Sequence, residues 1–376
     1  MQQVGAVEPC LFRFRVGNLD VYRAFRSTMR DFGVVATVIP TFQEAAHIEL
    51  CLRSLMTQSY SAEKHHILVY DGGSTDGTRD IVEKLAIESR TNNGPLIELF
   101  ENPGKYVPHA RNLSLMQLGD DVEYVFEMIG HAWVPKNHLE VRLERFAEIE
   151  GKLGRKIGGL GARVIESDLP RTFIEDCAEA TLTSPLGGSG QFARFSKESA
   201  TKIPPFTLYR REVLEEVGGW NEDFITTQDS ELNLRIIDAG WPLWRTAETS
   251  VRMAKRNSLK RWWGMGYRYG FWRMKHVVEA RSRMRIGEFL PWIGLMIVLG
   301  LAIDGQSTGG ISNFLIPINL YICALLLVGI DEARRWKNPM LIFGVPLLLL
   351  LLHISFSIGL FFGIFSRSKP HLDRIS

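Results

Sequence analysis

Two short apolar runs each end in polar residues that are suited to binding a charged ligand. Residues 34–44 (VVATVIPTFQE) end in a turn from Pro40 to Glu44, and residues 67–78 (ILVYDGGSTDGT) end in Asp71 and a glycine-rich turn. Ligands of open α/β sheets bind outside the carboxyl ends of the strands. We therefore predict that these two ends lie side by side and form half of a nucleotide pocket.

Single residues in these two turns support more than one role. The Asp71 carboxylate can accept a hydrogen bond from the imide N–H of a nucleobase, and Gly72 and Gly73 let the backbone approach a ligand closely. Asp76 can contact the ligand or cap the next helix, because short oxygen side chains accept from the free N–H groups at a helix start. Glu44 has the same two interpretations.

The elements that must position these turns follow an alternating pattern of strands and helices. Apolar residues recur at helical spacing after each of the two strands, and Pro108 is suited to opening a further helix. This order predicts an α/β fold with a mainly parallel, doubly wound sheet. The predicted strands span residues 34–39, 67–70, 96–100 and 122–128, and two later helices span 211–217 and 229–239.

Charge is balanced over the whole chain but not locally. The 376 residues include 44 basic and 42 acidic ones, whereas residues 251–285 hold eleven basic side chains and one acidic one. Aromatic residues interleave with these cations, which is typical of a cytosolic membrane interface. Nucleic-acid binding is the competing interpretation, and the apolar segments directly downstream argue against it. The four cysteines are scattered, so we expect no disulfide and a reducing, cytosol-facing compartment.

Three apolar runs, 289–303, 311–330 and 340–365, predict a multi-pass membrane protein. About 20 helical residues cross a bilayer core, so the second and third runs can span it and the first is marginal. The basic stretch and residues 334–337 both favour the cytosolic side. The basic tail, residues 366–376, then falls on the other side if the third run crosses once. Either the first run is re-entrant or interfacial, or the tail violates the positive-inside rule.

The motifs, in this order, resemble family 2 glycosyltransferases, which have the GT-A fold. Residues 40–44 and the segment DGGSTDGT (71–78) resemble the opening of that family, and NPGKYVPHARN (102–112) is similar to its next segment. Two later segments, YRREVLEEVGGWNE (209–222) and QDSELNLR (228–235), are similar to the succinoglycan-type branch of membrane-associated members. Several motifs in one order make the resemblance more specific than any one of them.

The resemblance implies which residues bind the donor. It implies that Asp71 lies on the uracil of a UDP-sugar and that the turn from Pro40 to Glu44 surrounds the nucleotide. Gly73, Asp76 and Arg111 belong to the same predicted donor site.

Asp229 occupies the position where the family places its general base. Such a base takes the proton of the acceptor hydroxyl as its oxygen attacks the anomeric carbon. The alternative is an aspartate that merely stabilises the helix N-terminus through the helix dipole. Glu231 shares the same first turn and is expected to be supporting. The glycine-rich segment 184–195 is either an acceptor-side loop or an ordinary surface loop.

The segment FEMIGH (126–131) departs from the family pattern. The family usually ends this strand Asp-x-Asp, and this branch often reads Asp-Ala-His, whereas here Ile129 replaces the first aspartate. Oxygen ligands suit Mg²⁺ or Mn²⁺, and imidazole tolerates Mn²⁺. His131 is therefore a candidate ligand for a metal that bridges the diphosphate, or else a strand-end histidine without that role. Glu127 lies on the same strand face but two residues from the expected position.

The resemblance and the apolar segments together imply an inverting glycosyltransferase on the cytoplasmic face of the cell membrane. It would move a sugar from a UDP-sugar to a polyprenyl-diphosphate-linked glycan in cell-surface polysaccharide assembly. One alternative is a catalytically impaired nucleotide-sugar-binding or scaffold relative, and another is a membrane-bound nucleotidyltransferase, against which residues 228–235 argue. The predicted parts are an N-terminal extension that lies on the membrane surface or packs on the domain (1–33), a GT-A domain (34–250), a basic-aromatic juxtamembrane segment (251–288), two or three transmembrane helices (289–365) and a basic tail (366–376).

Overall fold

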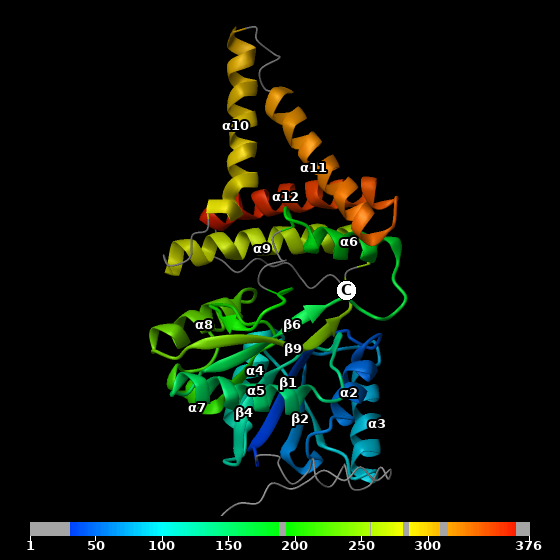
Figure 1. The fold of residues 1–376 in the computed structure, drawn as a ribbon, viewed down its shortest axis with the longest axis vertical. Helices are drawn as coiled ribbons and strands as arrows, with labels where there is room; N and C mark the ends of the chain where they lie inside the picture. The colour runs from blue at the N-terminus through cyan, green and yellow to red at the C-terminus, as the bar shows by residue number, and fades with distance from the viewer. Residues whose placement is uncertain (1–30, 188–192, 256, 281–285, 309–314, 366–376) are drawn as a thin grey trace, which may run out of the picture. The chain divides into compact units, whose positions relative to one another are not determined.

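One mixed sheet organises the part of the chain that carries the predicted motifs (Figure 1). β1 to β4 are parallel, and β8 runs antiparallel to its neighbours β4 and β6. The order across the sheet is β3-β2-β1-β4-β8-β6-β9-β5, with β7 paired to β9. The predicted mainly parallel α/β sheet is confirmed. The strands are β1 (Val34–Thr41), β2 (His65–Asp71), β3 (Leu96–Glu101), β4 (Val122–Glu127), β5 (Ala132–Trp133), β6 (Gly159–Ile165), β7 (Ser199–Ala200), β8 (Leu208–Arg210) and β9 (Leu243–Met253).

The computed structural model describes residues 31–187, 193–255, 257–280, 286–308 and 315–365. Nearly all of the predicted N-terminal extension and the whole basic tail lie outside the described residues, as do residues 188–192 of the glycine-rich segment.

β1 is buried along nearly its whole length because helices cover both faces of the sheet. On one face, Ala36 and Val38 of β1 share a core with Ala110 of α4 and Leu232 of α8. Pro108 lies in the first turn of α4, as its fixed φ favours. The helices of this part are α2 (Ile48–Met56), a 3₁₀ turn (Ala62–Lys64), α3 (Thr78–Thr91), α4 (Val107–Gln117), α5 (His138–Leu153), α6 (Phe173–Thr183), α7 (Arg211–Glu216) and α8 (Gln228–Asp238).

The second half of the sheet was not predicted. After Gly158 the sequence predicts the helices 211–217 and 229–239 among loops and short elements, but no strand, yet β6 and β9 pair there over seven registered positions. The eleven residues of β9 include Arg245, Glu248 and Arg252, which interrupt the apolar alternation that marks a strand. Its pairing with β5, β6 and β7 supplies what the local pattern lacks.

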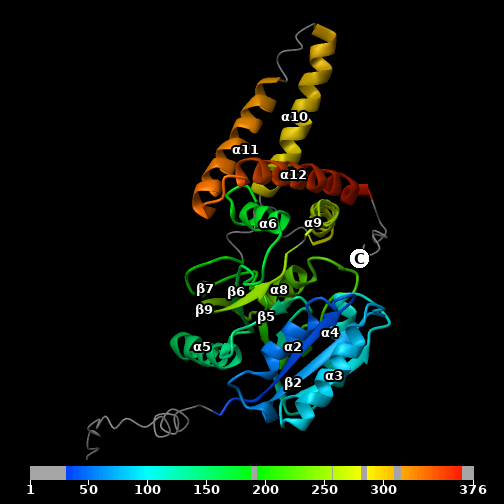
Figure 2. The ribbon, with the colours of Figure 1, turned by 90° about the vertical axis from the view of Figure 1, so that its right-hand side faces the viewer.

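Four helices follow the sheet: α9 (Leu259–Ala280), α10 (Ile286–Thr308), α11 (Leu315–Trp336) and α12 (Leu341–Phe365). By length and composition, α11 and α12 can each cross a membrane, whereas α10 contains a shorter apolar stretch from Phe289 to Asp304. This ranking agrees with the one made from the sequence. In Figures 1 and 2, α6 and α9 lie over the sheet, α12 lies on the far side of these two helices, and α10 and α11 extend away from the sheet.

Candidate active site

The two polar turns lie against each other at the carboxyl ends of β1 and β2, as predicted. β1 pairs with β2 so that Thr41 lies opposite Asp71. Beyond the strands, the backbone N–H of Gln43 donates to Ser74 Oγ at 2.9 Å, and that of Glu44 donates to Thr78 Oγ1 at 2.9 Å. The prediction that these two distant segments meet at one edge of the sheet is therefore confirmed.

Asp71 holds the second turn in place through hydrogen bonds to its backbone. Its carboxylate is 1% exposed and accepts from the backbone N–H groups of Gly73 at 3.0 Å and Ser74 at 2.9 Å. Gly73 has a φ of 91°, a left-handed conformation that side-chain-bearing residues rarely adopt. The geometry makes Asp71 and Gly73 organisers of the turn.

Asp76 joins the second turn to the first. Its carboxylate accepts from the backbone N–H of Ala45 at 3.0 Å and from that of Thr78 at 3.1 Å. Burial alone would raise the pKa of Asp76, but hydrogen bonds from Thr78 and Ala45 outweigh it and hold the pKa below its ordinary value. Asp76 is thus ionised and fixed beside the first turn of α3, which fits its capping interpretation.

A cavity of about 2490 Å³ opens above these turns. It is larger than the roughly 300–1,000 Å³ of an ordinary small-molecule pocket, so it has room for more than one substrate. Most of the predicted site residues line it: Pro40, Glu44, Asp76, Arg111, His131 and Asp229. Asp71 and Gly73 are not among the described residues that line it.

Glu44 and His131 meet in this cavity. His131 Nδ1 lies 2.8 Å from Glu44 Oε1, and Ile129 lines the wall two residues before His131. Within the described residues, no three His, Cys, Asp or Glu side chains gather as a metal cage. Mg²⁺ in phosphate sites is often held by one or two protein ligands, with substrate oxygens and water completing the shell. Glu44 and His131 fit that pattern as a two-ligand set.

Arg111 pairs with a second carboxylate that the sequence did not select. Its Nη1 lies 2.7 Å from Oε1 of Glu127, and both side chains are at most 7% exposed. Trp220 Nε1 donates to the same oxygen at 3.2 Å. Burial raises the pKa of Glu127, with Arg111 opposing and Asp229 adding to the rise. The signal for Glu127 was a charge in an otherwise apolar strand end, where a buried carboxylate needs a partner.

Asp229 lies in the first turn of α8 and faces the cavity. Thr227, which precedes the helix, has a φ of 65°, a strained conformation for a β-branched residue that is found mostly at functional sites. One oxygen of Asp229 accepts from the backbone N–H of Ser230 at 2.7 Å. Glu231 instead pairs with Arg235 at 2.7 Å, which agrees with a supporting role.

The other end of the cavity is basic and then apolar. Arg194 and Lys255 both pair with Glu179, which is fully buried in α6. Lys260, Arg261 and Arg268 of α9 line the same region. Beyond them the wall is formed by α10, α11 and α12, with the apolar residues Leu290, Leu295, Val298, Ile318, Ile322 and Phe356.

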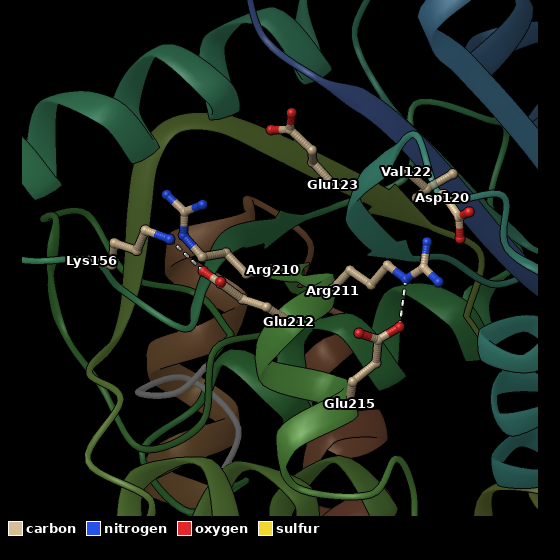
Figure 3. Close-up of a pocket in the computed structure, with 8 residues that line it drawn as sticks. All are labelled: Asp120, Val122, Glu123, Lys156, Arg210, Arg211, Glu212 and Glu215. Carbon is tan, nitrogen blue, oxygen red and sulfur yellow. Dashed lines mark hydrogen bonds and ion pairs between the residues drawn. The ribbon is translucent and has the colours of Figure 1, made fainter.

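A smaller pocket of about 430 Å³ lies near the start of β4 (Figure 3). Its charged groups neutralise one another, since Lys156 pairs with Glu212 at 2.8 Å and Arg211 with Glu215 at 2.6 Å. It lies at the amino end of β4, whereas ligands of such sheets bind at the carboxyl ends. The large cavity is therefore the candidate active site.

The fold is that of the GT-A glycosyltransferases. A solved structure, the mannosyltransferase PcManGT from Pyrobaculum calidifontis in complex with GDP-Man and Mn²⁺, superposes with a TM-score of 0.56 and 19% identity, covering 90% of this chain and 93% of that one. Residues 37–218 match the family model of glycosyl transferase family 2. This match supports a glycosyltransferase of family 2.

Two curated relatives extend the similarity beyond the matched domain. The dolichyl N-acetyl-alpha-D-glucosaminyl phosphate 3-beta-D-2,3-diacetamido-2,3-dideoxy-beta-D-glucuronosyltransferase of Methanococcus voltae is 26% identical over 331 residues, which are 88% of this chain and 97% of that protein. The succinoglycan biosynthesis protein ExoA of Rhizobium meliloti is 27% identical over 327 residues, covering 86% of this chain and 92% of that protein. The predicted succinoglycan type is thereby supported.

Proposed function

We propose that the protein transfers a sugar, with inversion, from a UDP-sugar to a polyprenyl-diphosphate-linked glycan at the cytoplasmic face of the membrane. One observation carries this proposal: a single cavity contains the Asp229 carboxylate, the two donor turns and an apolar wall from three C-terminal helices. Such a cavity suits a reaction between a polar nucleotide-sugar and an acceptor whose other end is a hydrocarbon chain.

Asp229 is the proposed general base. Its carboxylate takes the proton from the acceptor hydroxyl as that oxygen forms a bond to the anomeric carbon. The bond from the anomeric carbon to the diphosphate oxygen breaks on the opposite face, and the nucleoside diphosphate leaves with that electron pair. One displacement inverts the anomeric centre. Buried Glu127 is the neighbouring carboxylate, and the charge of Asp229 contributes to its raised pKa.

The donor half consists of Pro40, Glu44, Asp71, Gly73, Asp76 and Arg111. We assign Asp71 and Gly73 to holding their turn in place, since the Asp71 carboxylate accepts from the backbone N–H groups of Gly73 and Ser74 and also pairs with Arg79 of α3 at 3.5 Å. Arg111 is committed to Glu127 and orders the wall beside the donor. Glu44 and His131 would hold a divalent ion, Mg²⁺ or Mn²⁺, together with the diphosphate. When bound, that ion would neutralise charge on the leaving group.

The acceptor half is proposed from the charge and polarity of the cavity wall. Arg194 and Lys255 share the single carboxylate of Glu179, so together with Lys260, Arg261 and Arg268 of α9 they leave net positive charge on the wall of the cavity. A lipid-linked phosphate or diphosphate needs this order: sugar at the base, phosphate at the cations and hydrocarbon at the helices. The Methanococcus voltae relative supports the proposal, since its name describes a dolichyl sugar phosphate as the acceptor.

A donor and acceptor screen tests this function. The purified full chain in lipid nanodiscs is given UDP- or GDP-sugars with Mn²⁺ or Mg²⁺, and either a polyprenyl-diphosphate-linked sugar or the same sugar without lipid. We expect UDP release and an inverted linkage on the lipid-linked acceptor alone. Binding of UDP without transfer from any donor would instead identify the nucleotide-sugar-binding or scaffold relative that Ile129 favours.

A further inference from the structure

Of the two helices long enough to cross a membrane, α12 has a higher mean hydropathy than α11, yet it packs along the basic helix α9. We propose that α12 does not cross the membrane but lies in the bilayer surface together with α9, and that α10 and α11 alone enter the bilayer. The chain after Phe365 then lies on the same side as the glycosyltransferase domain. This inference concerns the membrane interface and does not rest on the proposed reaction.

Close contact between α9 and α12 depends on two facing pairs of glycines. Each helix carries a Gly-x-x-x-Gly pattern, at Gly266 and Gly270 in α9 and at Gly359 and Gly363 in α12. A Cβ atom placed on Gly270 would lie 2.0 Å from the Phe356 carbonyl oxygen. Such small residues let two helix backbones approach closely.

The glycines of α12 and a tryptophan of α9 show the same close packing of the two helices. A Cβ on Gly359 would lie 2.2 Å from the carbonyl oxygen of Tyr267, and one on Gly363 would lie 2.6 Å from that of Phe271. Trp262 Nε1 donates to the Leu348 carbonyl at 2.9 Å. The contact therefore runs along most of both helices. Early residues of α9 meet early residues of α12 and late residues meet late ones, so the two helices run in the same direction.

The charges on α9 fix its position relative to the bilayer. It carries Lys260, Arg261, Arg268, Arg273 and Lys275 within 22 residues. Charged side chains are costly in the hydrocarbon core and favourable beside anionic headgroups. A helix that is fixed along α9 cannot stand across the bilayer unless these cations enter it too.

α12 is also attached to the glycosyltransferase domain through α6. A Cβ on Gly344 would lie 2.2 Å from the Sγ atom of Cys177. Cys177 and Ala178 of α6 share one core with Trp262 of α9 and Leu348 of α12. α6 follows β6 in the chain, so it connects this core to the glycosyltransferase domain. Both contacts join α12 to the layer formed by α6 and α9.

The free side of α12 suits hydrocarbon. Its exposed residues include Phe343, Leu347, Phe361 and Phe365, the first of them 73% exposed. Figures 1 and 2 show α12 lying across the foot of α10 and obliquely under α11, rather than standing beside them. α12 carries no Asp, Glu, Lys or Arg of its own, so it lacks the charged face of an amphipathic surface helix. Its proposed place at the bilayer surface depends on its packing along the cationic helix α9.

This arrangement removes the conflict that the sequence left open. The basic stretch before α10 and residues 334–337 at the end of α11 lie on one side, joined by two helices that enter the bilayer and return. If α12 stays at the surface, the tail with Arg367, Lys369 and Arg374 stays on that side as well. All three basic regions then obey the positive-inside rule.

Cysteine labelling of the full chain tests the placement. Cys10 and Cys323 are replaced by alanine, the buried Cys51 and Cys177 are kept, and Asn92→Cys or Ser376→Cys is introduced singly. A membrane-impermeant maleimide is applied to inverted and to right-side-out vesicles. We expect both introduced cysteines to be labelled in the same vesicle preparation and neither to be labelled in the other. Labelling of Ser376→Cys in the opposite preparation from Asn92→Cys would overturn the proposal.

A matched pair of glycine variants tests what holds α12 in place. Gly359→Leu removes the close contact with α9, whereas a Cβ on Gly300 in α10 would meet no atom of the described residues within 4 Å, so Gly300→Leu serves as the control. We expect Gly359→Leu to release α12, so that Ser376→Cys becomes labelled in both preparations, while Gly300→Leu leaves the labelling one-sided. Equal, one-sided labelling of the two variants would show that the α9 contact does not hold α12.

Discussion

The contact between Glu44 and His131 gives His131 a carboxylate partner at the place where Ile129 departs from the usual metal-site pattern. Ile129 supplies no ligand, and the carboxylate beside His131 comes from the turn after β1 instead of from the segment that ends β4. No spacing rule reveals such a pair, because its two residues are 87 positions apart. The glutamate was selected from the sequence as a donor residue, and the histidine as a metal ligand; their proximity is new.

Substituting the members of this pair should change metal dependence. We expect His131→Ala and Glu44→Gln each to raise the Mn²⁺ concentration needed for half-maximal transfer by roughly 10–100-fold, since each removes one of two protein ligands. The measurement is a metal titration of UDP release at saturating donor. Glu49→Gln, on the exposed face of α2, serves as the control. Unchanged titrations for both variants would exclude this pair as the metal site.

At the scale of elements, the first half of the fold was predictable and the second was not. β1 and β2 are apolar runs with clear ends, so their positions and the meeting of Asp71 with the Pro40–Glu44 turn followed from periodicity. β9 carries charges and depends on three partner strands, which local pattern cannot show. Likewise, the Arg111–Glu127 pair depends on how α4 lies against β4.

The pairing of β1 with β2 contains a buried histidine that should make stability depend on pH. His65 is 1% exposed and lies 2.8 Å from Thr37 Oγ1, and burial lowers its pKa from 6.5 to about 3. The folded state keeps His65 neutral where the unfolded chain binds a proton. Stability from this residue is therefore complete above pH 6.5 and is lost as the pH falls from there toward about 3.

A pair of histidine variants measures this effect. Between those two pKa values, one differential proton changes the free energy of unfolding by about 1.4 kcal/mol per pH unit. We expect His65→Gln to remove that share of the slope in denaturant unfolding, although a slope from buried His138 remains. His66→Gln, next in the chain and only half-buried, should keep the full slope. Equal slopes for His65→Gln and the unsubstituted protein would contradict the account.

At the scale of the whole molecule, the large cavity joins parts that the sequence could only place in order. The motifs located the donor turns and Asp229, and the apolar runs located the membrane part. That the two share one cavity follows from the packing of α9 against α12, through two Gly-x-x-x-Gly pairs whose facing each other the sequence does not reveal. The same packing explains why counting apolar residues overstates how many helices cross.

The most direct test of the account compares Asp229→Asn with Glu231→Gln. The two acidic residues share the first turn of α8, but Asp229 faces the cavity and Glu231 pairs with Arg235. Sugar transfer and UDP affinity are measured on the same preparations in nanodiscs. Removing a general base should slow transfer by about 10²–10⁴-fold and leave UDP affinity unchanged, while Glu231→Gln keeps most of the rate. Transfer by Asp229→Asn at the rate of the unsubstituted enzyme would contradict the proposed mechanism.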